Sequence, residues 1–302
     1  MLRIIAYHYV RDKKKALFKK LYALDIKDFN NQLDYLQKKY SLVSVKDLIE
    51  NRNLKNSALL TFDDGYLDHY KYVFPILLKR KISGLFFAPY TTLKQKDLLD
   101  VNKLQIIFNK NIDRKKLLKI LYNEMNKRSL NIQYYLKLQS EKKKKFDLRW
   151  HDNETNIIRN FLQYLLPKTD RKKIINQLFS KTVNIDSRDI IKQMYLNEKH
   201  AKEMINNNMH FGSHGTSHEW LEYLSYRDQY EDIKKSKDLL LNLGVKERYL
   251  TICYPFGSYN KQTIQISKKL NFKLGFANYK GVVRNIEKKP FEIPRIDTNE
   301  LI

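Results

Sequence analysis

Two adjacent carboxylates, Asp63 and Asp64, stand at the end of an apolar run in the sequence Thr61-Phe-Asp-Asp-Gly65. Like charges this close raise each other's pKa unless a cation or hydrogen bonds compensate them. A metal ion is one such compensation, in which one carboxylate binds the ion and the other stays free to act as a base. Taken alone, however, the stretch is more typical of an ordinary turn, because Asp and Gly dominate turns.

Two histidines, His214 and His218, lie four residues apart in the stretch His210-Phe-Gly-Ser-His-Gly-Thr-Ser-His218. On a helix this spacing places both imidazoles on one face, and a tight loop can also bring them together. A pair at this spacing after a strand fits a metal site and an ordinary pair of polar side chains about equally well. His210 points to the other face by strand alternation, so we assign it no role.

Three weaker signals also follow predicted strands. The loop Tyr254-Pro255-Phe-Gly257 could direct backbone N–H groups at a developing oxyanion. Arg295, near the end of the sequence, could hold a catalytic carboxylate by a bidentate hydrogen bond. His8 follows the first predicted strand, on the side where a general acid is required. Each of these also fits a plain turn, a surface arginine or a polar residue at the rim.

Strands and helices alternate through most of the chain, which indicates parallel strands joined by helical crossovers. In such folds the functional groups collect at the carboxyl ends of the strands, where Asp63 and Asp64 are predicted to stand. The expected strands cover residues 2–7, 57–62, 82–88, 209–212, 249–254 and 273–277, and the expected helices cover residues 25–40, 44–49, 66–80, 197–205, 225–244 and 261–270.

The middle of the chain differs in composition from the rest. It has no glycine and a single proline, Pro167, and leucines such as Leu117 and Leu121 recur at helical spacing. We therefore predict one domain over residues 1–302 that is interrupted by a helical insertion at about 93–189. The insertion is expected to form a lid or a docking surface for a lipid-linked or acidic glycan.

The chain is strongly basic, with 58 Lys and Arg against 33 Asp and Glu and a formal net charge of +25. Such a field attracts anions, including nucleic acid, acidic lipid and acidic glycans. The excess is mostly lysine, and runs such as Lys13–Lys15 and Lys142–Lys145 are more typical of solvated surface. Because no nucleic-acid-binding signature accompanies them, we expect no nucleic-acid partner.

The cysteine count and the hydrophobic pattern indicate in which cellular compartment the protein is expected. The single cysteine, Cys253, allows no internal disulfide and stands in an apolar run, so we interpret it as a small core residue. The first residues lack a secretory signal region, and no apolar run reaches the roughly 18 residues of a membrane span. We expect a cytoplasmic protein, with peripheral association at the inner membrane left open.

The motifs taken together carry a family resemblance. Thr61–Gly65, Ser213-His-Gly-Thr-Ser-His218 and Tyr254–Gly257, in this order, resemble the first three motifs of the NodB-like polysaccharide deacetylases, carbohydrate esterase family 4. The opening Tyr7-His-Tyr-Val10 and the closing Pro294-Arg-Ile296 are similar to a branch of that family in bacterial envelope-glycan pathways. The resemblance covers roughly residues 1–92 and 190–302.

The resemblance implies an α/β fold, a distorted (β/α) barrel of about seven strands. It makes Asp63 the general base and makes Asp64, His214 and His218 the ligands of a divalent ion. Three protein ligands leave one position open, which is the pattern of a catalytic site. Zinc is the expected ion, with cobalt, nickel or iron as alternatives. The backbone N–H of Tyr254, in a loop shaped by Pro255 and Gly257, would stabilise the oxyanion.

Two departures from the family pattern change the expected roles. The third motif lacks the arginine that orients the base, so we expect Arg295 to take that role. No histidine follows His218 to serve as the family's late catalytic acid, so His8 is the expected acid. The implied reaction is metal-dependent hydrolysis of N-acetyl groups on an amino-sugar-containing polysaccharide or glycan intermediate. An O-acetyl esterase and a non-catalytic glycan-binding module are the alternatives, and the sugar and the oligomeric state stay open.

Overall fold

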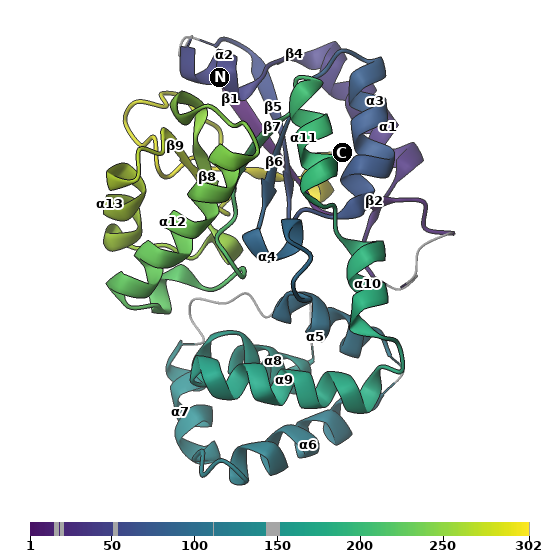
Figure 1. Ribbon diagram of the computed structural model, residues 1–302, viewed down its shortest axis with the longest axis vertical. Coiled ribbons are helices and arrows are strands. Elements are labelled where there is room, and N and C mark those ends of the chain that lie inside the picture. Colours follow the sequence, from purple (N-terminus) through teal and green to yellow (C-terminus); the bar gives the residue numbers. More distant parts are fainter. Residues whose placement is uncertain (15–17, 19–20, 51–53, 111, 143–151, 302) are drawn as a thin grey trace. The chain divides into compact units, whose positions relative to one another are not determined.

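The computed structural model describes residues 1–302 except for 15–17, 19–20, 51–53, 111, 143–151 and 302. The chain forms two compact units (Figure 1). The barrel unit comprises Met1–Asp97 and Ser187–Ile302, and the helical unit comprises Leu98–Asp186. The chain therefore leaves the barrel unit after Asp97 and returns to it at Ser187.

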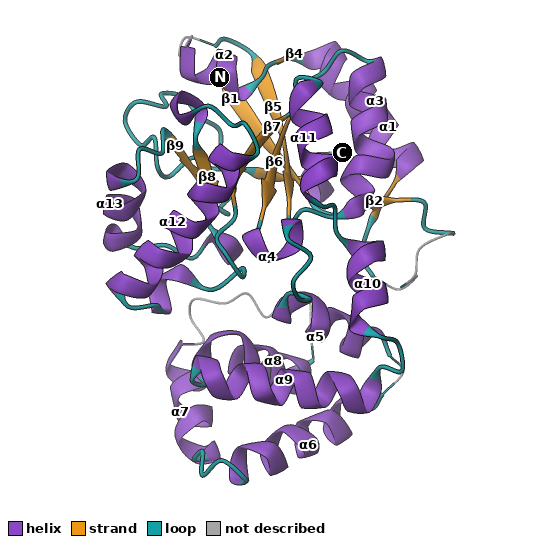
Figure 2. Ribbon diagram, viewed as in Figure 1, coloured by secondary structure: helices purple, strands orange, loops and turns teal. Residues whose placement is uncertain are grey.

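A parallel sheet forms the centre of the barrel unit (Figure 2). Its strands are β1 Leu2–Tyr7, β4 Ser41–Leu42, β5 Ser57–Asp63, β6 Gly84–Ala88, β7 His210–Ser213, β8 Thr251–Cys253, β9 Leu274–Phe276 and β10 Ile296–Asp297, and a separate parallel pair consists of β2 Val10–Arg11 and β3 Leu24–Asp25. Seven strands follow in the spatial order β10-β1-β5-β6-β7-β8-β9, and β4 pairs with the beginning of β5. This half-barrel with surrounding helices confirms the predicted distorted (β/α) barrel.

The helices of the barrel unit follow the strands in sequence. They are α1 Ile26–Lys39, α2 Val45–Glu50, α3 Phe74–Lys79, α4 Tyr90–Leu93, α10 Ser187–Met194, α11 Glu198–Asn206, α12 Tyr226–Asn242 and α13 Lys261–Lys269. Several of them begin after capping residues, among them Asp25, Asn197, Ser225 and Asn260, whose side chains accept a backbone N–H of the first turn. Such caps satisfy N–H groups that have no partner inside the helix.

Several predicted elements are shorter than expected by a few residues, including one helix and one strand next to the site. The helix predicted over 66–80 is helical from residue 67, with a π-helical turn His69–Val73 before α3. Residues 64 and 65 have left-handed φ angles of 74° and 66°, so helical backbone cannot start at the end of β5. The strand predicted over 249–254 is reduced to β8, because Glu247–Tyr249 form a 3₁₀ turn.

Strand alternation assigns each side chain to one of two packed faces. Leu59 and Phe87 belong to the cluster that includes residues of α2, whereas Phe62 and Phe86 belong to the cluster beneath α1 and α3. All four side chains are at most 1% exposed. Because side chains on a strand alternate with a period of two, Asp63 shares the face of Leu59, which directs its carboxylate into the interior of the barrel.

A closing segment connects the two edges of the sheet. The backbone N–H of Ile293 donates to the carbonyl of Gly275 in β9 at 2.9 Å. A few residues later Ile296 of β10 pairs with Ile5 of β1. Arg295 lies between these two attachments, so its backbone is held next to the interior of the barrel.

The helical unit is built from helices in the residues that the structure describes. They are α5 Asp100–Asn109, α6 Arg114–Asn126, α7 Ile132–Lys142, α8 Asn153–Asn160 and α9 Lys168–Thr182, with a π-helical turn at Phe161–Leu165. Its buried apolar side chains recur at helical spacing, as the sequence pattern predicts, and include Leu117, Leu121, Met125, Ile174 and Leu178.

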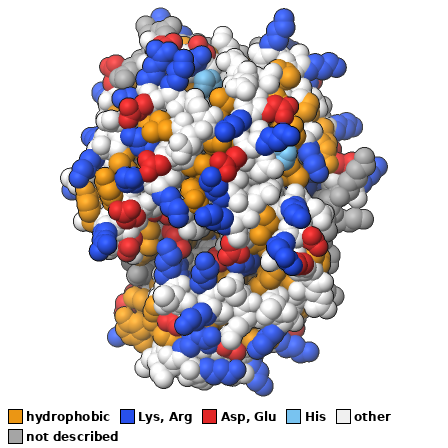
Figure 3. Space-filling view, in the orientation of Figure 1, with side chains coloured by type: hydrophobic (Ala, Val, Ile, Leu, Met, Phe, Trp, Pro, Cys, Tyr) orange, Lys and Arg blue, Asp and Glu red, His pale blue; other side chains and the backbone are white. Residues whose placement is uncertain are grey.

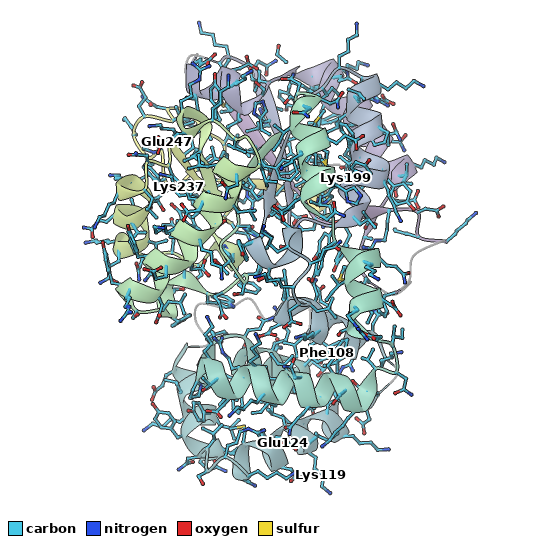
Figure 4. All side chains as sticks on the ribbon, viewed as in Figure 1. Phe108, Lys119, Glu124, Lys199, Lys237 and Glu247 are labelled. Carbon is cyan, nitrogen blue, oxygen red and sulfur yellow. The ribbon has the colours of Figure 1, made fainter. Side chains whose placement is uncertain are left out.

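One carboxylate, Glu124, comes from α6 of this helical unit (Figure 4). Only 2% of its surface is exposed. It contacts Lys127 at 3.1 Å and Arg128 at 2.8 Å on its own helix, and Lys181 of α9 at 3.5 Å. The hydrogen bond from Arg128 and the contacts with lysines lower the pKa of Glu124 to about 2. The ion cluster therefore ties α6 to α9.

On the face drawn in Figure 3, lysine and arginine side chains are distributed over the surface, with acidic and hydrophobic side chains between them. The positive charge of the chain is thus not confined to one element on that face. Among the described residues, no helix combines the length and the apolar character that crossing a membrane requires.

Candidate active site

The chemistry-bearing residues follow neighbouring strand ends. Asp63 ends β5 and pairs with Phe87 of β6, Ala88 pairs with Ser213 at the end of β7, and Ser213 pairs with Ile252 of β8. The carboxyl ends of these parallel strands therefore lie side by side. Residues that directly follow them converge, although more than a hundred residues separate the first motif from the second.

Asp64, His214 and His218 meet in one cluster. The Nε2 atoms of His214 and His218 lie 3.4 Å and 3.2 Å from Oδ1 of Asp64. Oδ1 of Asp64 is buried, and neither approach has the geometry of a hydrogen bond. One carboxylate and two imidazoles that face one point form the donor set of a catalytic metal site with an open position. The three side chains therefore fit a divalent cation.

Additional contacts, made to residues outside the cluster, set the orientation of His214 and Asp64. Nδ1 of His214 lies 2.8 Å from the carbonyl oxygen of Cys253, which turns Nε2 towards Asp64. The hydroxyl of Tyr66 donates to Oδ2 of Asp64 at 2.8 Å, which leaves Oδ1 for the imidazoles. Such contacts orient metal ligands and fix the imidazole tautomer.

Two of these residues have a strained backbone, as do several residues away from the site, among them Lys81 and Gln95. Asp64 and His218 have left-handed φ angles of 74° and 59°. For residues other than glycine, this conformation costs on the order of 1 kcal/mol or more and is found mostly at functional sites. The strain is tolerated because neighbouring contacts hold the two loops in place.

The loop that carries the histidines is fastened to helix α12. The backbone N–H of Thr216 donates to Oδ1 of Asp232 at 2.9 Å, and the Thr216 hydroxyl donates to the Asp232 carbonyl at 2.8 Å. Gly215 has a φ of 69°, and a Cβ there would lie 2.6 Å from Oδ1 of Asp232. Glycine is therefore required between the first histidine and Thr216.

Asp63 is paired with Arg295 inside the barrel. The guanidinium donates two hydrogen bonds to the carboxylate, both at 2.8 Å, and the two side chains are 1% and 4% exposed. The Nε of Arg295 also donates to the carbonyl of Ala277 at 3.2 Å. Bidentate pairing of this kind holds a carboxylate both in position and in its charged form. The sequence-based expectation that Arg295 reaches Asp63 agrees with this contact.

The two carboxylates keep their charge despite burial. Burial alone raises the pKa of Asp63, but the guanidinium of Arg295 outweighs it and brings the pKa below the usual range. Burial likewise opposes ionisation of Asp64, yet the nearby His218 and the contact with His214 hold its pKa well below the usual range. Both carboxylates are therefore anionic near neutral pH.

The two imidazoles differ in their affinity for a proton. Burial opposes the charged form of His214, but its contacts with Cys253 and Asp64 outweigh this and raise its pKa well above the usual value. In His218, burial outweighs the attraction of Asp64, so the pKa is lowered. Metal binding requires neutral imidazoles, so an ion at this site would compete with the proton on His214.

His8 lies at the edge of the cluster. Its Nε2 is 3.7 Å from Oδ2 of Asp63, and 45% of its side chain is exposed. Its backbone carbonyl lies 2.7 Å from Nε2 of the fully buried His69. Burial lowers the pKa of His69 to about 4, so this ring is neutral and its Nε2–H donates to the carbonyl. This hydrogen bond from His69 therefore holds the backbone of His8 in position.

The expected role of Tyr254 requires a correction. Its backbone N–H donates to the carbonyl of Phe276 at 3.1 Å, so it is engaged between strands and cannot also bind an oxyanion. Pro255 has no N–H, and the N–H of Gly257 donates to the Tyr254 carbonyl at 2.9 Å. The remaining N–H of this loop belongs to Phe256, for which the described residues provide no hydrogen-bond acceptor.

Sequence reasoning missed two aromatic residues next to the cluster. Phe256 has a left-handed φ of 57°, and its ring lies 4.4 Å from that of His218. Trp220 stacks on Phe256 at 4.7 Å and an interplanar angle of 11°. Both side chains are half-buried. Their closeness in sequence to the second and third motifs was the one available signal.

Comparison with known proteins gives a family match but no curated relative. No curated protein matches this chain by sequence. The profile of the polysaccharide deacetylase family matches residues 138–275, slightly less than half of the chain. This range contains His214, His218 and the loop at Tyr254–Gly257, whereas the Asp63-Asp64 pair precedes it.

Solved structures share the fold at low sequence identity. The deacetylase PplD of Streptococcus pyogenes, in complex with acetate, is 20% identical with a TM-score of 0.59, over 98% of this chain and 91% of PplD. IcaB from Ammonifex degensii is 18% identical with a TM-score of 0.57, over 98% and 91%. A de-N-acetylase from Aggregatibacter actinomycetemcomitans is 15% identical with a TM-score of 0.56, over 98% and 94%.

Motifs, profile and fold agree with one another. The three motifs occur in the order of the family, the profile match covers two of them, and the half-barrel is shared with solved deacetylases. The predicted resemblance is thereby confirmed. The chain is thus similar to the polysaccharide deacetylase family of hydrolases in its motifs and in the profile match over residues 138–275, and it shares the NodB-like fold with solved deacetylases.

Proposed function

We propose that this protein is a divalent-metal-dependent hydrolase that removes N-acetyl groups from an amino-sugar-containing polysaccharide or glycan intermediate. The observation that carries the proposal is the ionised Asp63, held by Arg295, next to the cluster of Asp64, His214 and His218. A base beside a three-ligand site is the arrangement that metal-assisted hydrolysis requires.

The cluster of Asp64, His214 and His218 would hold the ion. Their ligand atoms lie within 4.8 Å of one another, and this donor set suits zinc, with cobalt, nickel or iron as alternatives. When bound, such an ion would supply a Lewis acid and lower the pKa of water to near neutrality. Asp64 and the histidines serve only to hold and orient it.

Asp63 is the proposed general base. It would accept a proton from the attacking water, and Arg295 keeps its carboxylate anionic and oriented until that step. Because Arg295 occupies both oxygens, the base cannot rotate away from the reacting atoms. Its depressed pKa means that activity should persist to acidic pH.

His8 is the proposed general acid. It is the histidine near Asp63 that keeps 45% of its side chain exposed, so a substrate can reach it. It would deliver a proton to the departing sugar nitrogen, which cannot leave as an anion. The backbone N–H of Phe256 replaces that of Tyr254 as the proposed donor to the oxyanion.

The choice of substrate rests on two kinds of support. One compared structure is that of a de-N-acetylase, and PplD was solved with acetate, the product of deacetylation. The Tyr7–Val10 and Pro294–Ile296 stretches favour a bacterial envelope glycan. Hydrolysis of an O-acetyl ester would pass through the same kind of oxyanion, so it is the second candidate.

The test is acetate release by the purified full chain. N-acetylglucosamine oligomers and an O-acetylated glycan are compared before chelation, after chelation and after zinc is restored. We expect acetate from the N-acetylated substrate, loss on chelation, recovery with zinc and loss in Asp63→Asn. Release from the ester alone would make the protein an esterase. Glycan binding without acetate release, unchanged in Asp63→Asn, would make it a non-catalytic binding module.

A further inference from the structure

The turn after β5 holds a tyrosine, Tyr66, against the carboxylate of Asp64. The geometry points to Tyr66 as a positioning residue that restricts Asp64 to binding the cation through Oδ1 alone. This inference rests on the proposed metal-dependent function. It adds a residue with no role of its own in the proposed reaction, because the phenol of Tyr66 is neither a proposed metal ligand nor the proposed base.

The contact divides the two oxygens of Asp64 between different tasks. Oδ2 accepts the Tyr66 hydroxyl at 2.8 Å, whereas Oδ1 faces His214 and His218 at 3.4 Å and 3.2 Å. A carboxylate side chain rotates readily about its last torsion, because that torsion has broad minima. A hydrogen bond to one oxygen removes this freedom and leaves a single oxygen for the ion.

The ring of Tyr66 is held by other aromatic side chains. It stacks on Tyr9 with centroids 3.9 Å apart and on Tyr195 at 6.2 Å, and the edge of His69 approaches at 5.8 Å. Only 1% of Tyr66 is exposed. The hydroxyl is therefore directed at Asp64 by packing, independently of whether an ion is bound.

The backbone of this turn is fastened by residues that flank the helical unit in sequence. Tyr66 forms a bridge with Tyr195, and the N–H of Leu196 donates to the carbonyl of Gly65 at 3.1 Å. The side-chain amide of Gln95 donates to the carbonyl of Tyr195, also at 3.1 Å. Chain segments on both sides of the insertion thus hold the turn that carries Tyr66.

The test compares Tyr66→Phe with a matched control, Tyr195→Phe. Each substitution removes one hydroxyl and keeps its stacked ring, but the Tyr66 hydroxyl is the one bonded to Asp64. The dissociation constant for zinc is measured by competition with a chromophoric chelator, and the absorption spectrum of the cobalt-loaded protein reports ligand geometry. We expect Tyr66→Phe to weaken zinc binding by about 10–100-fold and to change the cobalt spectrum. Tyr195→Phe should leave both unchanged.

A double-mutant cycle shows whether the effect passes through Asp64. In an Asp64→Asn background, adding Tyr66→Phe should cause no further loss of affinity. A further loss as large as in the native background would contradict the positioning role. If Tyr66→Phe does not fold, 3-fluorotyrosine at position 66 keeps the ring and hydroxyl but changes the donor strength, and an unchanged cobalt spectrum would then overturn the inference.

The outcomes separate this inference from the proposed function. If the native protein binds zinc, His214→Ala does not, and Tyr66→Phe binds as tightly as the native protein, only the positioning role fails. If the native protein and His214→Ala both fail to bind zinc, the metal site itself is wrong and both proposals fall.

Discussion

Glu124 in the helical unit and Asp64 in the barrel unit are carboxylates with 2% and 5% of their surface exposed. Glu124 contacts three cationic side chains, from Lys127, Arg128 and Lys181. Asp64 contacts two imidazoles, and its Oδ1 accepts no hydrogen bond. The charge of Glu124 is compensated within the protein, whereas that of Asp64 is compensated only in part.

The difference separates a structural ion cluster from the proposed binding site. Burying a charge is costly unless an opposite charge pairs with it. A buried carboxylate that the protein pairs only in part is therefore expected where a bound ligand completes the pairing. Asp63, next to it, is fully paired with Arg295 and so keeps its charge for another task. Predictions that alter one cluster and leave the other intact test this distinction.

The largest effect is expected for His214→Ala. It removes one ligand of the proposed site, and activity should fall on the order of 10³-fold, because a catalytic ion contributes several kcal/mol. Acetate release and bound zinc are measured together. Glu124→Gln, in the structural cluster, serves as the control and should retain native activity; equal losses in both variants would remove the distinction between the clusters.

Arg295→Ala should destabilise the protein by about 3–5 kcal/mol, since it leaves Asp63 buried and unpaired. Loss of the guanidinium also raises the pKa of Asp63, which that group now holds down. Because the base acts only when ionised, the acidic limb of kcat/KM should move to higher pH. Urea unfolding and a pH–rate profile check the two effects. An unmoved acidic limb in the folded variant would show that Arg295 does not control the base.

Glu124→Gln should destabilise the protein by roughly 1–2 kcal/mol at neutral pH, because two of the three cations are lysines screened by water. The folded-state pKa of Glu124 is lowered from 4.5 to about 2. Its contribution to the free energy of unfolding is therefore full above pH 4.5 and declines as the pH falls towards 2. Unfolding of both proteins across this range measures it, and a difference independent of pH would contradict it.

The smallest effect is expected for Cys253→Ala. The thiol is buried 3.9 Å from Oδ2 of Asp63, and with Asp63 and His214 it forms a second group of possible ligands. Arg295 already occupies Asp63, so we expect no metal there and a cost of only about 1 kcal/mol from the lost packing. Unchanged zinc content and nearly native activity are the expected results, and loss of a thiolate band in the cobalt-loaded protein would refute them.

Much of the site could be predicted from residue types and their order. Asp64, His214 and His218 converge as expected, because parallel strands bring their carboxyl ends to one edge. Arg295 was placed near a carboxylate by its position near a predicted strand end. The oxyanion donor could not be predicted, because whether the N–H of Tyr254 is free depends on its pairing with Phe276.

The sequence by itself determined the alternation of strands and helices, the identity of the proposed ligand side chains and the family that they resemble. These depend on local periodicity and on short motifs, which are contained in consecutive residues. Only the tertiary structure decided that Arg295 binds both oxygens of Asp63 and that Tyr66 holds Asp64. Hydrogen bonds of this kind depend on distances of a few tenths of an ångström between side chains from separate elements, which no sequence spacing specifies.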